Sequence, residues 1–221
     1  MSILTCLVTH DRLALTQKCV ASWRATARPQ DRLIIIDNAS TDGTVEWLSE
    51  TWPLAQMIYN PDNKYPGLAC NQGWELGLSL GFTPDFLHRC DNDIEMLPGW
   101  GDEVEAAFAT HPDLALLGIL NLHEDRHSEP HDALGAIEPI ERVGGNVVIP
   151  VRYFRDEGMR WVYDPLTEDG PFSYAGHARG TVAMLVNTMA NNMAFCRALD
   201  YPEYYKHTAG IRGIGDWEHS T

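Results

Sequence analysis

The sequence predicts an α/β protein whose mainly parallel central sheet is flanked by helices. Short, almost entirely apolar runs alternate along the chain with segments whose apolar residues recur at helical spacing. Strands that are apolar on both faces are typical of a parallel sheet that helices cover on both sides. With 221 residues, 44% of them apolar, the chain is long enough for one large domain and is neither a coiled coil nor a disordered chain.

The elements follow one another in a regular order through the first half. Strands are expected at residues 2–8, 33–36, 56–59, 85–90 and 114–120. Helical spacing lies between them at residues 15–23, 67–80 and 104–108. Ser40 or Asp42 can cap a further helix that ends near Glu50. The second half is less periodic, with expected strands at residues 147–151 and 182–186.

We expect a single domain over residues 1–221, with a functional boundary near residue 120. Polar clusters follow three of the strands directly, at residues 9–12, 37–42 and 91–93. Ligands of open parallel sheets bind beyond the carboxyl ends of the strands. The three clusters are therefore expected to meet at one site.

Composition excludes several classes of protein. Sixteen basic against 31 acidic residues give a net charge of −15, the wrong sign for a protein that mainly binds a phosphate backbone. Five cysteines without a CxxC pair are expected to be reduced thiols in the core. The longest apolar runs are far shorter than a membrane span and residues 1–8 lack the features of a secretion signal, so we expect a cytoplasmic protein with no integral membrane segment.

Asp91 and Asp93 flank one residue at the end of an expected buried strand, so both side chains can leave the sheet edge. Mg²⁺ and Mn²⁺ commonly bind one or two protein carboxylates and complete their shell with substrate phosphates. The spacing therefore suits a site for a metal ion and a diphosphate. The same tripeptide also fits a loop of helix caps and solvated acids.

Four motifs in order, at residues 8–12 (VTHDR), 36–44 (IDNASTDGT), 63–73 (NKYPGLACNQG) and 91–93 (DND), resemble the family 2 glycosyltransferases of GT-A fold. The resemblance covers about residues 3–100 and returns at residues 215–218 (GDWE). It implies a GT-A fold, a nucleotide-diphosphate sugar as donor and Mn²⁺ or Mg²⁺ as cofactor. Residues 1–120 would then be the nucleotide-sugar-binding half and residues 121–221 the acceptor-binding half.

The resemblance also implies a role for individual residues around the donor. The residues that it places at the nucleotide sugar are Thr9, Asp11, Asp37, Asn38, Gly67, Asn71, Asp91 and Asn92. Asp91 would face the ribose and the metal, Asp93 would bind the metal directly, and His219 or His207 could complete the metal site. Many members have Asp where this chain has Asn38, and since an amide can both donate and accept, the base of the donor stays open.

The chemistry of sugar transfer adds a requirement for a base. Cleavage of a sugar–phosphate bond places positive charge on the sugar and negative charge on the diphosphate, which a metal ion stabilises. The attacking hydroxyl must lose a proton, which calls for a carboxylate within hydrogen-bond reach. Asp216 is the expected base, with Glu218 as an acceptor-positioning residue or a replacement base, and direct attack inverts the anomeric centre.

Two other function classes stay open beside the transferase. One is a nucleotidyltransferase, although that class typically needs a glycine-rich basic loop near the first strand and residues 9–12 contain no glycine. The other is a non-catalytic module that binds sugar nucleotides. The acceptor hydroxyl could belong to a saccharide, a small molecule or a modified nucleic acid, and the oligomeric state is open. Trp161, Tyr174 and Trp217 could stack on a sugar or a base, or could belong to the core.

Overall fold

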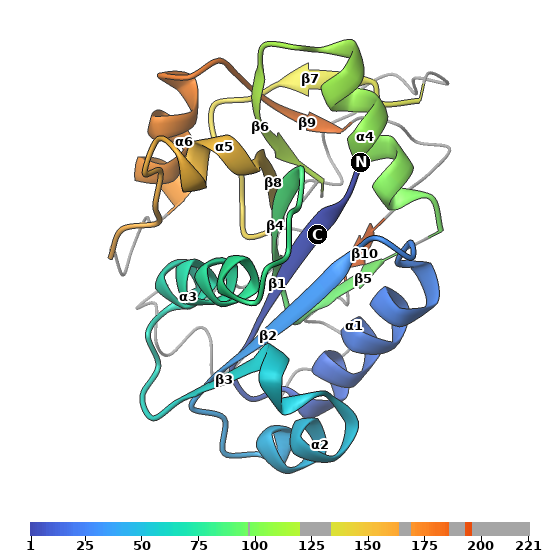
Figure 1. The fold of residues 1–221 in the computed structure, drawn as a ribbon, viewed down its shortest axis with the longest axis vertical. Helices are drawn as coiled ribbons and strands as arrows, with labels where there is room; N and C mark the ends of the chain where they lie inside the picture. The colour runs from blue at the N-terminus through green and yellow to red at the C-terminus, as the bar shows by residue number, and fades with distance from the viewer. Residues whose placement is uncertain (97, 120–133, 164–168, 186–192, 196–221) are drawn as a thin grey trace, which may run out of the picture.

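The computed structural model describes residues 1–96, 98–119, 134–163, 169–185 and 193–195, and in it strands and helices alternate as expected up to residue 91 (Figure 1). Beyond that residue the alternation is interrupted, with strands at residues 94–96 and 137–139 that were not expected. The strands are β1 (Ile3–Thr9), β2 (Arg32–Asn38), β3 (Met57–Asn60), β4 (Phe86–Asp91), β5 (Ile94–Met96), β6 (Leu114–Gly118), β7 (Ile137–Pro139), β8 (Val147–Pro150), β9 (Thr181–Leu185) and β10 (Met193–Phe195). The helices are α1 (Leu13–Thr26), α2 (Thr44–Thr51), α3 (Pro66–Ser79), α4 (Trp100–Thr110), α5 (Val151–Arg155) and α6 (Asp169–His177), with a 3₁₀ turn at Leu54–Gln56.

Eight of the described strands form one sheet in the order β3-β2-β1-β4-β8-β6-β9-β7, and β5 pairs with β10 beside it. The first four strands of that order are parallel, and so are β6 and β9. Strand β8 runs antiparallel to both β4 and β6, and β7 runs antiparallel to β9. The predicted α/β fold is confirmed, and its second half makes the sheet mixed.

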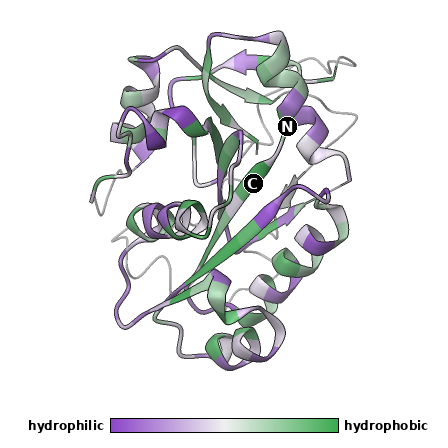
Figure 2. Cartoon of the chain, viewed as in Figure 1, coloured by the Kyte–Doolittle hydropathy of each residue, from purple (hydrophilic) through white to green (hydrophobic). Residues whose placement is uncertain are grey.

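Each face of the sheet carries its own core because successive side chains of a strand point to opposite sides. Leu7 of β1 packs on the side of α1 and α4, together with Trp23 and Trp100. Its neighbour Cys6 packs on the side of α3, α5 and α6, together with Trp74. Figure 1 shows these helices on opposite sides of the strands, and Figure 2 shows the apolar strands between them.

Helix α3 lies unusually close to β1 because two glycines face the strand. A Cβ atom on Gly73 would overlap with the side chain of Cys6, and one on Gly77 would overlap with Leu4. The close approach fixes α3 over the strand whose carboxyl end carries the first polar cluster.

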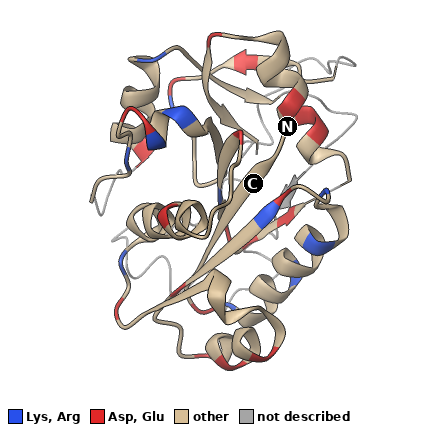
Figure 3. Cartoon of the chain, viewed as in Figure 1, with Lys and Arg blue, Asp and Glu red and all other residues tan. Residues whose placement is uncertain are grey.

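Acidic residues lie along α2 and α4, and Figure 3 marks them in red on these helices. Arg28 holds α4 to the amino edge of the sheet, since its guanidinium pairs with Asp31 (3.0 Å), Asp102 (3.3 Å) and Glu105 (2.9 Å). Some of the acidic side chains of the chain thus form ion pairs within the fold.

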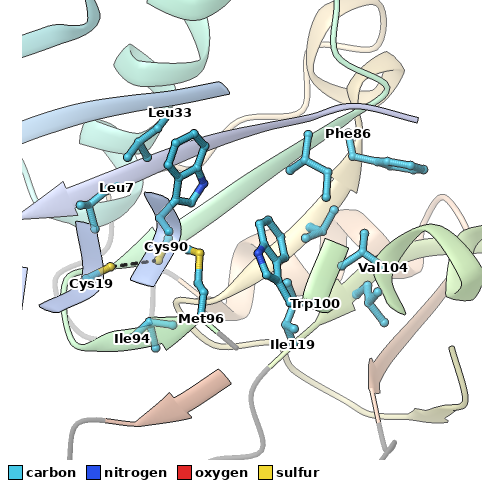
Figure 4. Close-up of a cluster of buried hydrophobic side chains, with 14 of the residues drawn as sticks. Leu7, Cys19, Leu33, Phe86, Cys90, Ile94, Met96, Trp100, Val104 and Ile119 are labelled. Carbon is cyan, nitrogen blue, oxygen red and sulfur yellow. Dashed lines mark hydrogen bonds between the residues drawn. The ribbon is translucent and has the colours of Figure 1, made fainter. Parts of the chain in front are cut away.

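The expectation of reduced core cysteines is confirmed for the cysteines in the described part of the chain. Cys6, Cys19, Cys70 and Cys90 are buried free thiols, whereas Cys196 lies outside the described residues. The sulfur atoms of Cys19 and Cys90 are 3.8 Å apart in the core between α1 and β4 (Figure 4). Among the described residues, no helix has both the length and the apolar character needed to cross a membrane.

Candidate functional site

The polar clusters that follow β1, β2 and β4 meet at one edge of the sheet. Strand β1 pairs in parallel with both β2 and β4, which brings Thr9 beside Asp37 and Val8 beside Asp91. The predicted convergence of the three strand ends is therefore confirmed.

Hydrogen bonds join the three strand ends to one another. The backbone N–H of Asp11 donates to the Ser40 hydroxyl (2.8 Å), and Oδ1 of Asp11 accepts from the backbone N–H of Thr41 (2.7 Å). The amide of Asn92, which is buried, donates to the Thr9 hydroxyl (3.1 Å) and to the Asp11 carbonyl (3.1 Å). Asp11 and Asn92 thus use their side chains to hold the rim of the site in shape.

The same edge concentrates backbone strain. The non-glycine residues with positive φ in the described chain all lie in loops that follow β1, β2 or β3, and they are Asp11, Arg12, Ala39 and Tyr65. Tyr65, at φ 65° and ψ 153°, adopts a conformation that is almost restricted to glycine. Such strain costs on the order of 1–3 kcal/mol per residue and clusters at functional sites.

The predicted helix caps act in a different way from the one expected. Helix α2 begins at Thr44 after Gly43, whose φ of 92° makes the turn, so neither Ser40 nor Asp42 is its N-cap residue. The carboxylate of Asp42 nevertheless accepts from the backbone N–H of Thr44 (3.2 Å) and from that of Leu13 (2.7 Å). Partial burial acts to raise the pKa of Asp42, but these hydrogen bonds and that of the Thr44 hydroxyl lower it below its usual value.

At the end of β2, Asp37 has a buried carboxylate that is only half satisfied. Its Oδ2 accepts from the backbone N–H of Ser40 (3.0 Å), while Oδ1 is buried and has no hydrogen-bond partner within the described chain. Burial raises the pKa of Asp37, although hydrogen bonds from Ser40 act to lower it. An unsatisfied buried acceptor is costly, so this oxygen suits a ligand that donates a hydrogen bond.

The neighbouring Asn38 is 1% exposed and holds the next loop in place. Its Oδ1 accepts from Nδ2 of Asn60 (2.9 Å) and from the backbone N–H of Lys64 (3.3 Å). Nδ2 of Asn60 also donates to the Gln72 side chain on α3 (2.9 Å). The chain of amides connects β2, β3 and α3 beside Asp37.

Asp91, the last residue of β4, and Asp93, two residues further on, each face an arginine. Oδ1 of Asp91 lies 3.3 Å from Nε of Arg89, and Oδ2 of Asp93 lies 3.2 Å from Nη1 of Arg12. The Asp91 and Asp93 side chains are 36% and 17% exposed, so both carboxylates stay within reach of a ligand. No group of three or more acidic, histidine or cysteine side chains suited to a metal ion is found among the described residues. Two carboxylates at one edge still fit Mg²⁺ or Mn²⁺ when substrate phosphates supply the remaining oxygens.

On α3, Gly67 is buried in the first turn and Asn71 binds a distant segment. The Asn71 side chain donates to the carbonyl of Trp161 (2.9 Å) and accepts from its backbone N–H (3.1 Å). Trp161 is 1% exposed and stacks on Phe172 at 3.7 Å, so it belongs to the core rather than to a stacking platform. Tyr174 is exposed.

Several predicted residues lie outside the described residues. These are the expected base Asp216, its neighbours Trp217 and Glu218, and the candidate metal ligands His207 and His219. Sequence reasoning missed Arg89, which the structure brings against Asp91. A basic residue in the middle of the apolar run FLHRC was the available signal, because an arginine is rarely buried without a partner.

A cavity of about 330 Å³ lies elsewhere, between the start of β4 and the start of α5. Its lining residues are Thr83, Pro84, Asp85, Pro150, Val151, Arg152 and Arg155, which do not include any predicted site residue. Thr83, Pro84 and Asp85 precede β4, and the other lining residues end β8 and form α5, so the cavity lies at the amino end of β4. The polar clusters lie at the carboxyl ends of the strands, and the strand-end site is therefore the better candidate for function.

Comparison with known families adds to this geometry. The sequence model of the family described as "Glycosyl transferase family 2" matches residues 5–200, most of the chain. The search among curated proteins found no match.

Solved glycosyltransferase structures share the fold at low sequence identity. TarS 1–349 of S. aureus is 15% identical with a TM-score of 0.66, over 99% of this chain and 67% of that one. A mannosyltransferase from Pyrobaculum calidifontis with GDP-Man and Mn²⁺ is 14% identical with a TM-score of 0.62, over 83% and 56% of the two chains. GalNAc-T7 with UDP, GalNAc and Mn²⁺ is 14% identical with a TM-score of 0.60, over 84% and 42%. The likeness shows the GT-A fold, and the chain spans 39% of a longer TarS structure.

Proposed function

Because the chain belongs to glycosyl transferase family 2 and is therefore a glycosyltransferase, we propose that it transfers a sugar, with inversion, from a nucleotide-diphosphate sugar to an acceptor hydroxyl with the help of Mn²⁺ or Mg²⁺. The observation that carries the proposal is the position of Asp37 and Asp91 at neighbouring strand ends of one sheet edge, together with the ion pair that joins Asp93 to Arg12 of the cluster after β1. At that edge Oδ1 of Asp37 is a buried acceptor without a partner among the described residues, which suits an N–H of the nucleobase. The carboxylates of Asp91 and Asp93 suit a cation that also binds the diphosphate.

The nucleotide is proposed to lie across the ends of β1 and β2. A base N–H that donates to Oδ1 of Asp37 would satisfy the acceptor that is otherwise unpaired among the described residues. The amide chain that begins at Asn38 fixes the loop on the other side of this position. Structural relatives bind UDP-GlcNAc in one case and GDP-Man in another, so both uridine and guanosine donors are candidates.

Asp91 and Asp93 are proposed to hold the cation beside the diphosphate. A divalent cation bound there supplies positive charge that stabilises the departing diphosphate. Arg12 adds a further positive charge at the same edge, 3.2 Å from Asp93. We propose Asp216 as the base that takes the proton of the acceptor hydroxyl, with Glu218 as a positioning or replacement carboxylate and His219 as a further ligand.

Turnover of a donor panel tests the proposed reaction. Release of nucleotide from UDP-, dTDP- and GDP-sugars is expected to require Mn²⁺ or Mg²⁺ and to stop on chelation. Asp93→Ala is expected to lower turnover by at least tenfold, whereas Asp102→Ala, an exposed aspartate on α4, leaves it unchanged. Full turnover by Asp93→Ala, or no turnover of any donor, would overturn the proposal.

The base assignment has its own test. Asp216→Asn is expected to abolish transfer to an acceptor while the donor binds with nearly unchanged affinity, because the variant keeps shape and loses basicity. A fully active Asp216→Asn variant would remove Asp216 from this role and leave the donor site untouched.

A further inference from the structure

Arg89 is a buried arginine in the middle of a core strand, and its burial must be compensated by other interactions. Its side chain is 3% exposed, and removing a guanidinium from water costs several kcal/mol, as an order of magnitude, unless partners compensate it. Two partners are carboxylates: Asp91 lies 3.3 Å from its Nε, and Asp169 at the start of α6 lies 3.4 Å from its Nη1. Both carboxylates are more than a third exposed, so the arginine reaches from the core to the edge of the site.

The guanidinium of Arg89 packs against an aromatic ring whose position is fixed by its neighbours. It lies 4.4 Å from the ring centroid of Trp161, a favourable cation–π distance. The Trp161 ring stacks on Phe172 of α6 with an interplanar angle of 4°, and Asn71 of α3 binds the Trp161 backbone through two hydrogen bonds. Two helices on one face of the sheet therefore fix where the charge of Arg89 lies.

The chain that enters β8 also lies against the Asp91 carboxylate. A Cβ atom on Gly145 would overlap with the Asp91 carboxylate, so the backbone itself lies against Oδ2. The next residue, Asn146, is buried, and its Oδ1 is 2.6 Å from Nε2 of His88. The Asp91 carboxylate thus lies against both Arg89 and Gly145.

We propose that Arg89 is a positioning residue that holds the Asp91 carboxylate in the orientation needed to bind the cation. This inference rests on the proposed role of Asp91. Through Asp169 and Trp161 the same arginine makes the cation site depend on the packing of the second half of the chain. Mutation of a residue that contacts a metal ligand typically lowers the metal affinity by about 10–100-fold. A carboxylate that is already oriented loses less entropy when it binds the cation.

Mn²⁺ binding in the presence of UDP or of GDP, followed by the electron paramagnetic resonance signal of free Mn²⁺, tests the proposal without turnover. Arg89→Met is expected to weaken Mn²⁺ binding at least tenfold, and Arg89→Lys to restore part of the affinity, because an ammonium can still pair with Asp91. Arg160→Met is the matched control, since Arg160 also stacks on an aromatic ring and pairs with a carboxylate, but with Phe154 and Glu75. Equal Mn²⁺ affinity in Arg89→Met and wild type would overturn the proposal.

Three further variants distinguish the possible causes of a change in Mn²⁺ binding. Gly145→Ala displaces the Asp91 carboxylate without changing charge and is expected to weaken Mn²⁺ binding to a similar degree, which decides the case if Arg89→Met does not fold. In an Asp91→Asn background, Arg89→Met is expected to cause no further loss, as coupling through Asp91 requires. If Asp91→Asn itself binds Mn²⁺ like the wild type, the proposed cation site is wrong. If Asp91 matters while Arg89→Met and Gly145→Ala bind normally, only the positioning role is wrong.

Discussion

Several polar side chains at this site form hydrogen bonds with other residues of the site. Asn38 is the clearest case, because its one carbonyl oxygen serves both Asn60 and the backbone of Lys64. Asn60 is the last residue of β3, and Lys64 lies in the loop that follows it, which is proposed to lie beside the nucleotide. The position of this loop therefore depends on a buried amide.

Asn38→Ala is expected to lower the free energy of unfolding by about 1–3 kcal/mol, because it leaves two donors without their acceptor in a buried place. Urea denaturation measures the change. Asn63→Ala is the matched control: Asn63 also accepts a backbone N–H, that of Tyr65, but at an exposed position where water can replace it. An Asn38→Ala protein as stable as the control would contradict this account of the loop.

Among the elements, α3 carries the most constraints, since it meets β1 through glycines and binds the Trp161 segment through Asn71. A helical glycine is normally destabilising by about 0.5–1 kcal/mol relative to alanine. Here the absence of a side chain lets the helix lie against the strand.

Gly73→Ala is accordingly expected to destabilise the protein by about 1–3 kcal/mol through overpacking against Cys6, despite the better helix propensity of alanine. Thermal or urea unfolding checks the sign. Ser79→Ala, at an exposed position of the same helix, is expected to change stability by less than about 0.5 kcal/mol. A stabilising effect of Gly73→Ala would show that the helix can move away from the sheet at little cost.

Strand β8 shows which part of the fold the sequence could not predict. The strands of the first half are local apolar runs, and the position of the site follows from their parallel order. A strand was expected at residues 147–151 and is observed at Val147–Pro150, but nothing local reveals that it pairs antiparallel between β4 and β6. Packing between residues far apart in the chain determines which strands pair with β8. Local sequence patterns do not contain this information.

The stability of the whole molecule is expected to depend on pH through the buried imidazole of His88. His88 is fully buried between Thr5 and Asn146, and burial lowers its pKa from 6.5 to about 4. The unfolded chain takes up this proton near pH 6.5 and the folded protein only near pH 4. Between these values the unfolded state binds more protons, so this contribution to stability is complete above pH 6.5 and is lost as the pH falls to 4.

The free energy of unfolding is expected to fall by up to about 3 kcal/mol over that range on account of His88. Urea denaturation of the wild type and of His88→Gln between pH 7.5 and pH 4 measures it: the variant starts from a lower stability and has the shallower slope. His177→Gln, at an exposed histidine, serves as the control and should keep the wild-type slope. Equal slopes in the wild type and His88→Gln would contradict the assignment.

For the site, residue types could be predicted and contacts could not. Polar residues at strand ends identified Asp37, Asp91 and Asp93, because a parallel sheet collects its strand ends at one edge. The hydrogen bonds of Asn71 to Trp161 and the ion pair of Arg89 with Asp169 join segments that are far apart in the chain. Such contacts depend on the folded packing of both halves, which a single sequence does not specify.

The central claim is that Asp91 and Asp93 bind a divalent cation together with the diphosphate of a nucleotide sugar. Calorimetric titration of the wild type with a UDP-sugar and with a GDP-sugar, each with and without Mn²⁺, tests it most directly. One donor is expected to bind in the presence of Mn²⁺, and chelation or Asp93→Ala is expected to weaken this binding at least tenfold. Donor affinity that is the same with Mn²⁺, without it and in Asp93→Ala would contradict the claim.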